Sequence, residues 1–187
     1  MTKKEETIEI RAWLRTRPEI RCGLITSPFG NALVSAVNGR IAGLSFCDDC
    51  ARGVEDMEAQ WPSADFIEDA GVAAAFASRI FRNGRIELPE EGVVLIGTGF
   101  QISVWKRVMA IPACRVVTYS DVARGIDRPE AVRAVASAIG RNPLAILVPC
   151  HRVVPMTGGI GQYRWGSERK RDLLAWEVVD SGQASMP

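Results

Sequence analysis

The stretch from Ile146 to Val154 sets the strongest constraint on how this chain folds. An apolar, β-prone run meets Pro149, then Cys150 and His151, the only histidine of the chain, and then returns to β-branched residues. A buried strand does not need Cys-His-Arg at its centre, and a proline there forces a turn. The stretch is therefore predicted as strand, corner and strand, with Cys150 held at the corner.

The local sequence leaves two roles open for Cys150. Free cysteines are often buried as small hydrophobic side chains. A cysteine beside a base is instead a candidate nucleophile, because the thiolate is the reactive form. Consecutive strand side chains point to opposite faces, so a contact between Cys150 and His151 needs the corner or a bridging water. A third group is expected to orient His151.

Six separated segments lie in one order along the second half of the chain, from about Gly97 through Glu177. They are Thr118-Tyr119, Ala131–Val135, Asn142-Pro143, Pro149–Val154, Gly161–Gly166 and Leu173–Glu177. In sequence and order they resemble the O6-alkylguanine-DNA alkyltransferases, also called methylated-DNA–protein-cysteine methyltransferases. The resemblance of the first half to the N-terminal α/β domain of that family is loose.

The expected fold class is α+β (α/β) in two domains. Residues 1–92 are expected to form an N-terminal α/β scaffold with an antiparallel β-meander and helices. Residues 93–179 are expected to form a mostly helical DNA-binding and catalytic domain with a helix-turn-helix and the active-site corner, and residues 180–187 a tail. Leu88–Gly92 has the composition of a linker.

The first half contains three short β-prone runs with turn residues between them. The runs are Cys22–Phe29, Ala32–Val37 and Arg40–Cys47, joined at Gly30-Asn31 and Asn38-Gly39. Asn-Gly is a strong hairpin signal because both residues tolerate positive φ. Short helices are predicted over Val54–Trp61, which Pro62 ends, and over Ala70–Arg82, with a C-cap at Asn83-Gly84.

The second half has several helix start and stop signals. We expect Thr98 to cap a helix over Phe100–Ala110, Val116–Tyr119 to be extended, and Ser120 to cap a helix to about Arg124. Asp127–Glu130 has the order of cap, proline and carboxylate that starts a helix, here running to Ile139. These two helices predict a helix-turn-helix. A last helix is predicted from Ser167 to about Val179.

The charge is unevenly distributed along the chain. Residues 1–94 hold 11 Lys+Arg against 15 Asp+Glu, whereas residues 95–178 hold 12 against 6, within a total of +1. The basic second half indicates an anionic partner. No apolar run has the length of a membrane span, and the first residues lack the apolar core of a signal peptide. We therefore expect an intracellular protein, cytoplasmic or nucleoid-associated, or nuclear in a eukaryote.

The five cysteines are an odd number, which suits a reducing compartment better than a disulfide framework. Cys47 and Cys50 have zinc-ligand spacing, but no second pair follows, and a site would have to recruit Cys22. Some members of the family carry zinc in the N-terminal part through histidines that have no counterpart here. We expect no metal and no cofactor.

The resemblance implies irreversible transfer of an alkyl group from guanine O6 to Cys150, and it leaves open whether thymine O4 also serves as a donor. It further implies roles for four residues: His151 as base, acting through water, Glu177 as its orienting partner, Tyr119 as donor to the departing guanine, and Asn142 as the tie on Cys150. On the residues themselves, three of these assignments have structural alternatives. Glu177 could be an exposed carboxylate, Tyr119 a core aromatic, and Asn142 a turn residue.

The partner that the resemblance implies is double-stranded DNA containing O6-alkylguanine, bound by a monomer away from membranes. The second helix of the helix-turn-helix would enter the minor groove, with Arg133 inserted into the base stack and the nucleotide flipped out. An exposed arginine on such a helix is otherwise mostly solvated surface. The expected DNA contacts are Arg133, Ala134, Thr118, Ser120, Arg141 and Arg152, the last of which could instead brace the corner. Arg169–Arg171 could face phosphates or solvent.

The substrate pocket is implied to consist of Val148, Pro149, Tyr163, Arg164 and Trp165. Backbone carbonyls near Val148 would read the guanine edge. Many relatives have small residues after the loop tyrosine, so Arg164-Trp165 resembles members with a narrower pocket. Three rival functions remain: a non-catalytic damage binder, a transcription regulator and a thiol hydrolase. Cys150 argues against the first, and repeated turnover would distinguish the last.

Overall fold

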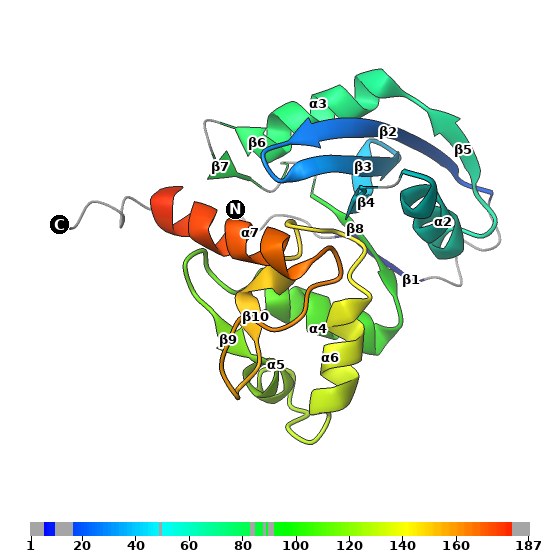
Figure 1. Cartoon of the computed structure of the whole chain (residues 1–187). Helices are drawn as coiled ribbons and strands as arrows, with labels where there is room; N and C mark the ends of the chain where they lie inside the picture. Colours follow the sequence, from blue (N-terminus) through cyan, green and yellow to red (C-terminus); the bar gives the residue numbers. More distant parts are fainter. Residues whose placement is uncertain are drawn as a thin grey trace. The chain divides into compact units, whose positions relative to one another are not determined.

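The computed structural model describes residues 6–9, 17–48, 50–82, 85–87, 89 and 92–180. The predicted C-cap at Asn83-Gly84, most of the predicted linker and residues 181–187 of the predicted tail lie outside these ranges. The chain divides into two compact units (Figure 1). Unit 1 comprises residues 1–102 and 143–147, and unit 2 comprises residues 103–142 and 148–187. The predicted boundary at residue 92 stays a prediction.

Unit 1 is built on a four-stranded sheet in the order β4-β3-β2-β5. The meander of β2 (Glu19–Ser27), β3 (Gly30–Val37) and β4 (Arg40–Phe46) is antiparallel, as predicted, and β5 (Asp65–Glu68) adds parallel to β2. Asn38 and Gly39 form the second turn with φ of 49° and 73°. The first turn lies at Pro28-Phe29, earlier than predicted, where Ser27 Oγ accepts from the Phe29 N–H.

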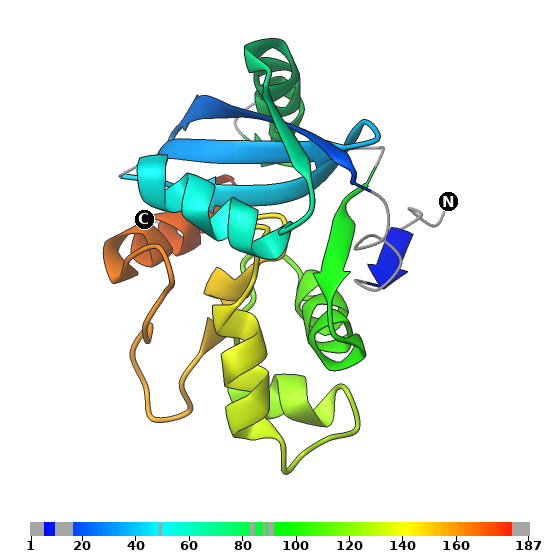
Figure 2. The same cartoon turned by 90° about the vertical axis from the view of Figure 1, so that its right-hand side faces the viewer.

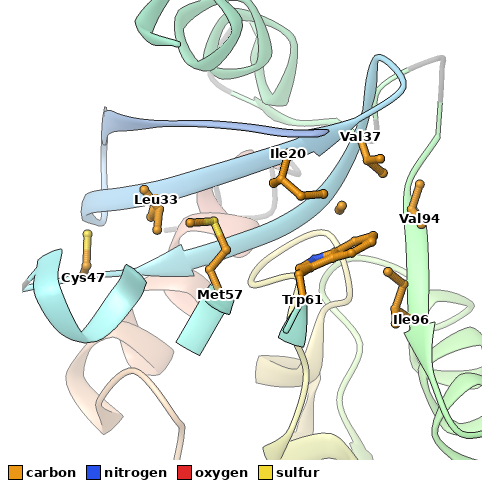
Figure 3. Packing of buried hydrophobic residues seen from close by; sticks show 9 residues of the cluster. Ile20, Leu33, Val37, Cys47, Met57, Trp61, Val94 and Ile96 are labelled. Atoms are coloured by element: carbon orange, nitrogen blue, oxygen red, sulfur yellow. The ribbon is translucent and has the colours of Figure 1, made fainter. Parts of the chain in front are cut away.

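Two helices pack on this sheet. The helix α3 (Ala70–Ile80) begins at Asp69, whose carboxylate accepts from the Val72 N–H, and lies against β2 at Gly23. A Cβ at Gly23 would lie 2.9 Å from the Cβ of Ala73, so only glycine allows this approach. The helix α2 (Cys50–Gln60) is longer than predicted. Figure 3 shows Met57 and Trp61 directed into the cluster formed with Ile20, Leu33, Val37, Val94 and Ile96.

Short strands complete unit 1. They are β1 (Glu6–Glu9), which pairs parallel with β8 (Val94–Gly97), and the two-residue hairpin β6 (Phe81–Arg82) and β7 (Arg85–Ile86). The segment 143–147 lies along β4, where the Leu44 N–H donates to the Pro143 carbonyl at 2.9 Å and the Ala145 N–H donates to the Leu44 carbonyl at 2.7 Å. This bonding holds the residues that precede the Cys-His pair.

Unit 2 is mostly helical, as predicted. Its elements are α4 (Gly99–Met109, of which the first four residues belong to unit 1), β9 (Val117–Thr118), α5 (Tyr119–Arg124), α6 (Val132–Gly140), the 3-10 helix η1 (Cys150–Arg152), β10 (Val153–Val154) and α7 (Ser167–Asp180). The pair β9 and β10 is parallel. Figures 1 and 2 both show α5 and α6 joined by one short loop, which is the predicted helix-turn-helix.

The predicted caps of the helix-turn-helix are wrong in position. Thr118, not Ser120, caps α5, and it forms a capping box in which the Asp121 carboxylate bonds back to the Thr118 N–H. The second helix starts at Val132 rather than at Asp127–Glu130, because Asp127 has a φ of 57° and turns the chain. The Thr98 cap of α4 is confirmed, since Gln101 and Thr98 exchange side-chain hydrogen bonds.

The predicted strand before the corner is also wrong. Ile146 has a φ of 67°, and residues 145–147 form a turn, so the apolar run carries only one bridge, from Leu144 to Leu44. The corner itself is the single turn η1, and β10 follows it as predicted. The α+β fold class is confirmed. Within the described ranges, no helix has both the length and the apolar character to cross a membrane.

Candidate active site

The corner holds Cys150 in a buried position with a fixed hydrogen-bond donor beside it. Cys150 is 5% exposed and starts η1. Asn142 is fully buried, and its Nδ2 donates to the Val148 carbonyl at 2.8 Å and to Cys150 Sγ at 3.1 Å. Asn142, which follows α6, thus bonds to the sulfur as the resemblance implied. Its side chain does more than form a turn.

The His151 side chain contacts α7. Its Nε2 lies 2.8 Å from Glu177 Oε1, and both side chains are buried. Glu177 is therefore no exposed helix-end carboxylate. The other ring nitrogen of His151, Nδ1, is buried and has no hydrogen-bond partner in the described part of the chain. That nitrogen remains available to accept a proton.

Further donors converge on the Glu177 carboxylate. Arg152 donates from Nε to Oε1 at 2.8 Å and pairs through Nη2 at 2.7 Å, while its Nη1 bonds to the Ile111 carbonyl at 2.6 Å. The Cys114 N–H donates to Oε2 at 3.0 Å. Of the two roles left open for Arg152, these contacts favour bracing the corner over binding phosphate.

These contacts fix the protonation of the His151–Glu177 pair. Burial alone would raise the pKa of the Glu177 carboxyl, but hydrogen bonds from His151, Arg152 and Cys114 lower it to about 2. Burial lowers the pKa of His151 below its usual 6.5, against the opposing hydrogen bond to Glu177. At neutral pH, Glu177 is ionised and can only accept. The proton of neutral His151 therefore sits on Nε2, and Nδ1 carries the lone pair.

The Cys150 thiol is protonated at neutral pH but surrounded by groups that favour its thiolate. Burial raises its pKa, and the Asn142 hydrogen bond, the Lys170 ammonium and the Tyr163 hydroxyl oppose the rise. The Tyr163 hydroxyl makes no well-formed hydrogen bond with any residue that the structure describes. It is nevertheless close to the sulfur. Burial raises the pKa of the Tyr163 hydroxyl most, and the nearby Cys150 raises it further. Such a thiol needs a base at the moment of reaction.

Lys170 is the site residue that sequence reasoning missed. It is fully buried, and its Nζ donates to the Val153 carbonyl at 2.7 Å. Its neighbour Arg169 bonds to the Trp165 carbonyl at 2.5 Å, and only Arg171 of this basic run is exposed. Helical spacing could have revealed Lys170, because it shares a face of α7 with Leu173 and Glu177, three and seven residues on.

Two tyrosines and a tryptophan lie around the sulfur and in the following loop. Burial, and then the neighbouring Cys150, raises the pKa of the half-buried Tyr119 phenol. Tyr163 packs edge-on against Trp165 with ring centroids 5.1 Å apart. Trp165 is 8% exposed, whereas Arg164 is exposed and its guanidinium lies 5.7 Å from the indole centroid. Of the predicted pocket residues, Val148 and Pro149 are buried beside Cys150 in the chain.

The helix α6 presents an exposed face of small residues together with an arginine. Val135, Ala138 and Ile139 are buried, and the Trp105 indole N–H donates to the Ala138 carbonyl at 2.9 Å. The exposed positions are Arg133, Ala134, Ser137, Gly140 and, just beyond the helix, Arg141. Thr118 and Ser120 are partly buried, and the Thr118 hydroxyl is engaged in the capping box. The small face is therefore not covered by a neighbouring helix.

The described residues contain no group of three or more His, Cys, Asp or Glu that could hold a metal ion. Cys47 is buried in the core of unit 1, and the side chain of Cys50 lies outside the described ones. The groups that the arrangement offers are a thiol, an imidazole bonded to a carboxylate, an ammonium and two phenols.

Comparison with known proteins finds similar proteins over most of the chain. Residues 99–179 match the family model for the DNA-binding domain of 6-O-methylguanine DNA methyltransferase. The inducible methylated-DNA–protein-cysteine methyltransferase of Bacillus subtilis is 35% identical over 153 residues, which cover 79% of this chain and 86% of that protein. The crystal structure of Mycobacterium tuberculosis OGT in complex with DNA aligns with a TM-score of 0.64 and 31% identity, over 85% of this chain and 92% of that one.

A longer relative matches over part of its length. The bifunctional transcriptional activator/DNA repair enzyme Ada of Escherichia coli is 36% identical over 164 residues, or 85% of this chain but only 46% of Ada. The chain thus spans about half the length of this relative. The similarity to the Bacillus subtilis protein extends over most of both chains. The chain therefore belongs to the methylated-DNA–protein-cysteine methyltransferase family.

Proposed function

We propose that this protein repairs DNA by moving the alkyl group of O6-alkylguanine onto Cys150, once per molecule. The observation that carries the proposal is the pair of corner residues Cys150 and His151 with a partner on each: Asn142 donates to the sulfur, and Glu177 of α7 bonds to His151 Nε2. Among the described residues, Nδ1 of His151 has no hydrogen-bond partner. The name of the Bacillus subtilis relative and the DNA complex of the Mycobacterium tuberculosis relative support the same assignment.

The proposed chemistry is a single displacement at the alkyl carbon. The Cys150 sulfur forms a bond to that carbon while the bond from the carbon to guanine O6 breaks. The thiol proton passes to His151 Nδ1, with a water between the two groups, and Glu177 stabilises the resulting imidazolium. Lys170 and Asn142 stabilise the negative charge that develops on sulfur before the bond is complete. The thioether has no route back, so each molecule reacts once.

The electron pair left on guanine needs a proton. The raised pKa of Tyr119 means that its phenol keeps its proton at neutral pH, so it can donate to the purine. Tyr163, pressed between Cys150 and Trp165, would form one wall of the pocket. The buried Trp165 indole packs against the Tyr163 ring, which supports a preference for small alkyl groups.

A base inside a duplex is out of reach of a buried sulfur, so the nucleotide must leave the stack. We propose that the exposed face of α6 enters the minor groove. Ala134, Ser137 and Gly140 would allow close approach of the backbone, and the Arg133 side chain would fill the vacated space. Arg141 would contact phosphate at the end of the helix. Such a protein acts where the DNA is, in a bacterium the cytoplasm or nucleoid.

The proposed function is tested by mass analysis of the protein after reaction. Incubation with duplex DNA containing one O6-methylguanine is expected to add a single methyl group to the peptide that bears Cys150. With excess substrate, the amount of guanine restored should equal the amount of protein. Undamaged duplex of the same sequence is the control. Continued repair beyond one event per molecule would instead support a turnover enzyme such as a hydrolase and contradict the proposal.

Arg133→Ala is expected to slow repair in duplex DNA by roughly 10- to 100-fold, because the vacated stack loses the side chain that keeps the base extruded. Single-stranded substrate has less stacking to overcome and should react at close to the wild-type rate. The measurement is the single-turnover rate constant on both substrates. Arg17→Ala, which removes an exposed arginine of unit 1, is the matched control. Equal slowing on both substrates would remove the extrusion role of Arg133.

A further inference from the structure

Cys114 holds a backbone conformation that its side chain does not favour. Its φ is 60°, in the left-handed region. Among the described residues, the other non-glycine positions with positive φ are Asn38, Asp127 and Ile146. Asn and Asp tolerate this region because their short polar side chains bond locally, whereas cysteine has no such advantage. The surrounding contacts must therefore keep Cys114 in place.

The hydrogen bonds that hold Cys114 go to one residue, Glu177. The Cys114 N–H donates to Glu177 Oε2 at 3.0 Å, and the Cys114 thiol donates to the Glu177 main-chain carbonyl at 3.0 Å. That carbonyl lies in the last described turn of α7. Cys114 thus bonds to Glu177 through both its backbone and its thiol.

The two oxygens of the Glu177 carboxylate accept hydrogen bonds from different donors. Oε1 accepts from His151 and Arg152, and Oε2 accepts from Cys114. A carboxylate held at one oxygen only can rotate about its last bond. We infer that Cys114 is a positioning residue, whose main-chain N–H fixes Oε2 and so keeps Oε1 aimed at His151 Nε2. The inference rests on the proposed function only for the role of His151 as the base that accepts the Cys150 proton.

The chain offers a direct spectroscopic test because His151 is its only histidine. The nitrogen-15 resonances of a single imidazole report its tautomer and titration without overlap, and without any alkyl transfer. In the wild-type protein, we expect the proton on Nε2 and a titration midpoint below the 6.5 of a free imidazole. The charged groups that act on His151 are Glu177, Arg152 and Lys170, and none of them is altered in the variants below.

Two substitutions separate the N–H from the thiol. Cys114→Gly removes the sulfur but keeps the N–H, and glycine adopts positive φ freely. Cys114→Val removes the sulfur and also disfavours positive φ, which displaces the N–H from Oε2. We expect the glycine variant to keep the wild-type tautomer and titration. The valine variant should populate both tautomers, move the titration midpoint and slow alkyl transfer by roughly 10- to 100-fold. If the valine variant does not fold, Cys114→Ala replaces it.

Each outcome decides the inference. Wild-type imidazole spectra in both variants would overturn it, because the N–H would then have no effect on the pair. Equal disturbance in both variants would overturn it as well, because the thiol would be the contact that matters. The expected spectra in all three proteins, with no methyl transfer to Cys150 in any of them, would contradict the proposed function and leave the positioning role intact.

Discussion

Cys150→Ala is expected to abolish methyl transfer completely while the protein still binds duplex DNA. In the proposed reaction the Cys150 sulfur is the atom that accepts the alkyl group. In the proposed binding mode, DNA contacts the exposed face of α6, which does not include Cys150. The loss of one buried sulfur atom removes little packing, so the variant should fold. Transfer is measured with O6-methylguanine duplex labelled in the methyl group, and binding by fluorescence anisotropy.

The control for this experiment is Cys22→Ala, which removes a half-buried thiol from β2 in unit 1. We expect it to accept one methyl group per molecule like the wild-type protein. If the labelled methyl group appears on any residue of the Cys150→Ala variant, a residue other than Cys150 accepts it. Loss of binding together with transfer would show that Cys150 has a structural role, which would leave its chemical role unsupported.

The Cys-His pair and its partners could be recognised in the sequence because they lie in short segments with distinctive composition. The pairing of His151 with Glu177, 26 residues later, came from the resemblance and not from spacing. Lys170 and Cys114 were missed for a physical reason. A lysine between two arginines looks like solvated surface, and only the packing of α7 buries it. The φ of Cys114 depends on its contacts with Glu177, which local sequence does not encode.

Some elements of the fold could likewise be predicted from the sequence, and others could not. The hairpin at Asn38-Gly39 was predictable because the turn residues themselves favour positive φ. The strands β5 and β8 were not predicted, because such short segments acquire strand conformation only from a partner strand. At α5 the predicted cap, Ser120, was wrong, because the capping box with Asp121 makes Thr118 the cap. The run before Pro149 looked like a strand but turns at Ile146.

Glu177→Gln is expected to slow methyl transfer by roughly 10²- to 10⁴-fold. The amide loses the charge that stabilises the imidazolium, and its NH2 group can donate to His151 Nε2. That bond would favour the tautomer with the proton on Nδ1, which could no longer accept from the Cys150 thiol. The single-turnover rate constant measures the loss, and the nitrogen-15 spectrum of His151 reports the change of tautomer.

The same substitution should also change stability in a pH-dependent way. The folded pKa of Glu177, about 2, lies below the 4.5 of a free carboxyl, so its ionisation stabilises the fold above pH 4.5, and this stabilisation is lost as pH falls towards 2. In the glutamine variant Arg152 also loses its charged partner. We therefore expect a lower free energy of unfolding at pH 7 and a weaker dependence on pH between 4.5 and 2, measured by urea denaturation.

Glu168→Gln is the matched control, because it makes the same change at an exposed position in the first turn of α7. It should keep the wild-type rate constant and tautomer, and it should lose at most a few tenths of a kcal/mol, roughly the value of one helix-dipole contact. A Glu177→Gln variant that is destabilised but reacts at the wild-type rate would separate the two roles. Glu177 would then hold the corner through Arg152 without assisting the imidazole, and the base that activates Cys150 would have to be sought elsewhere.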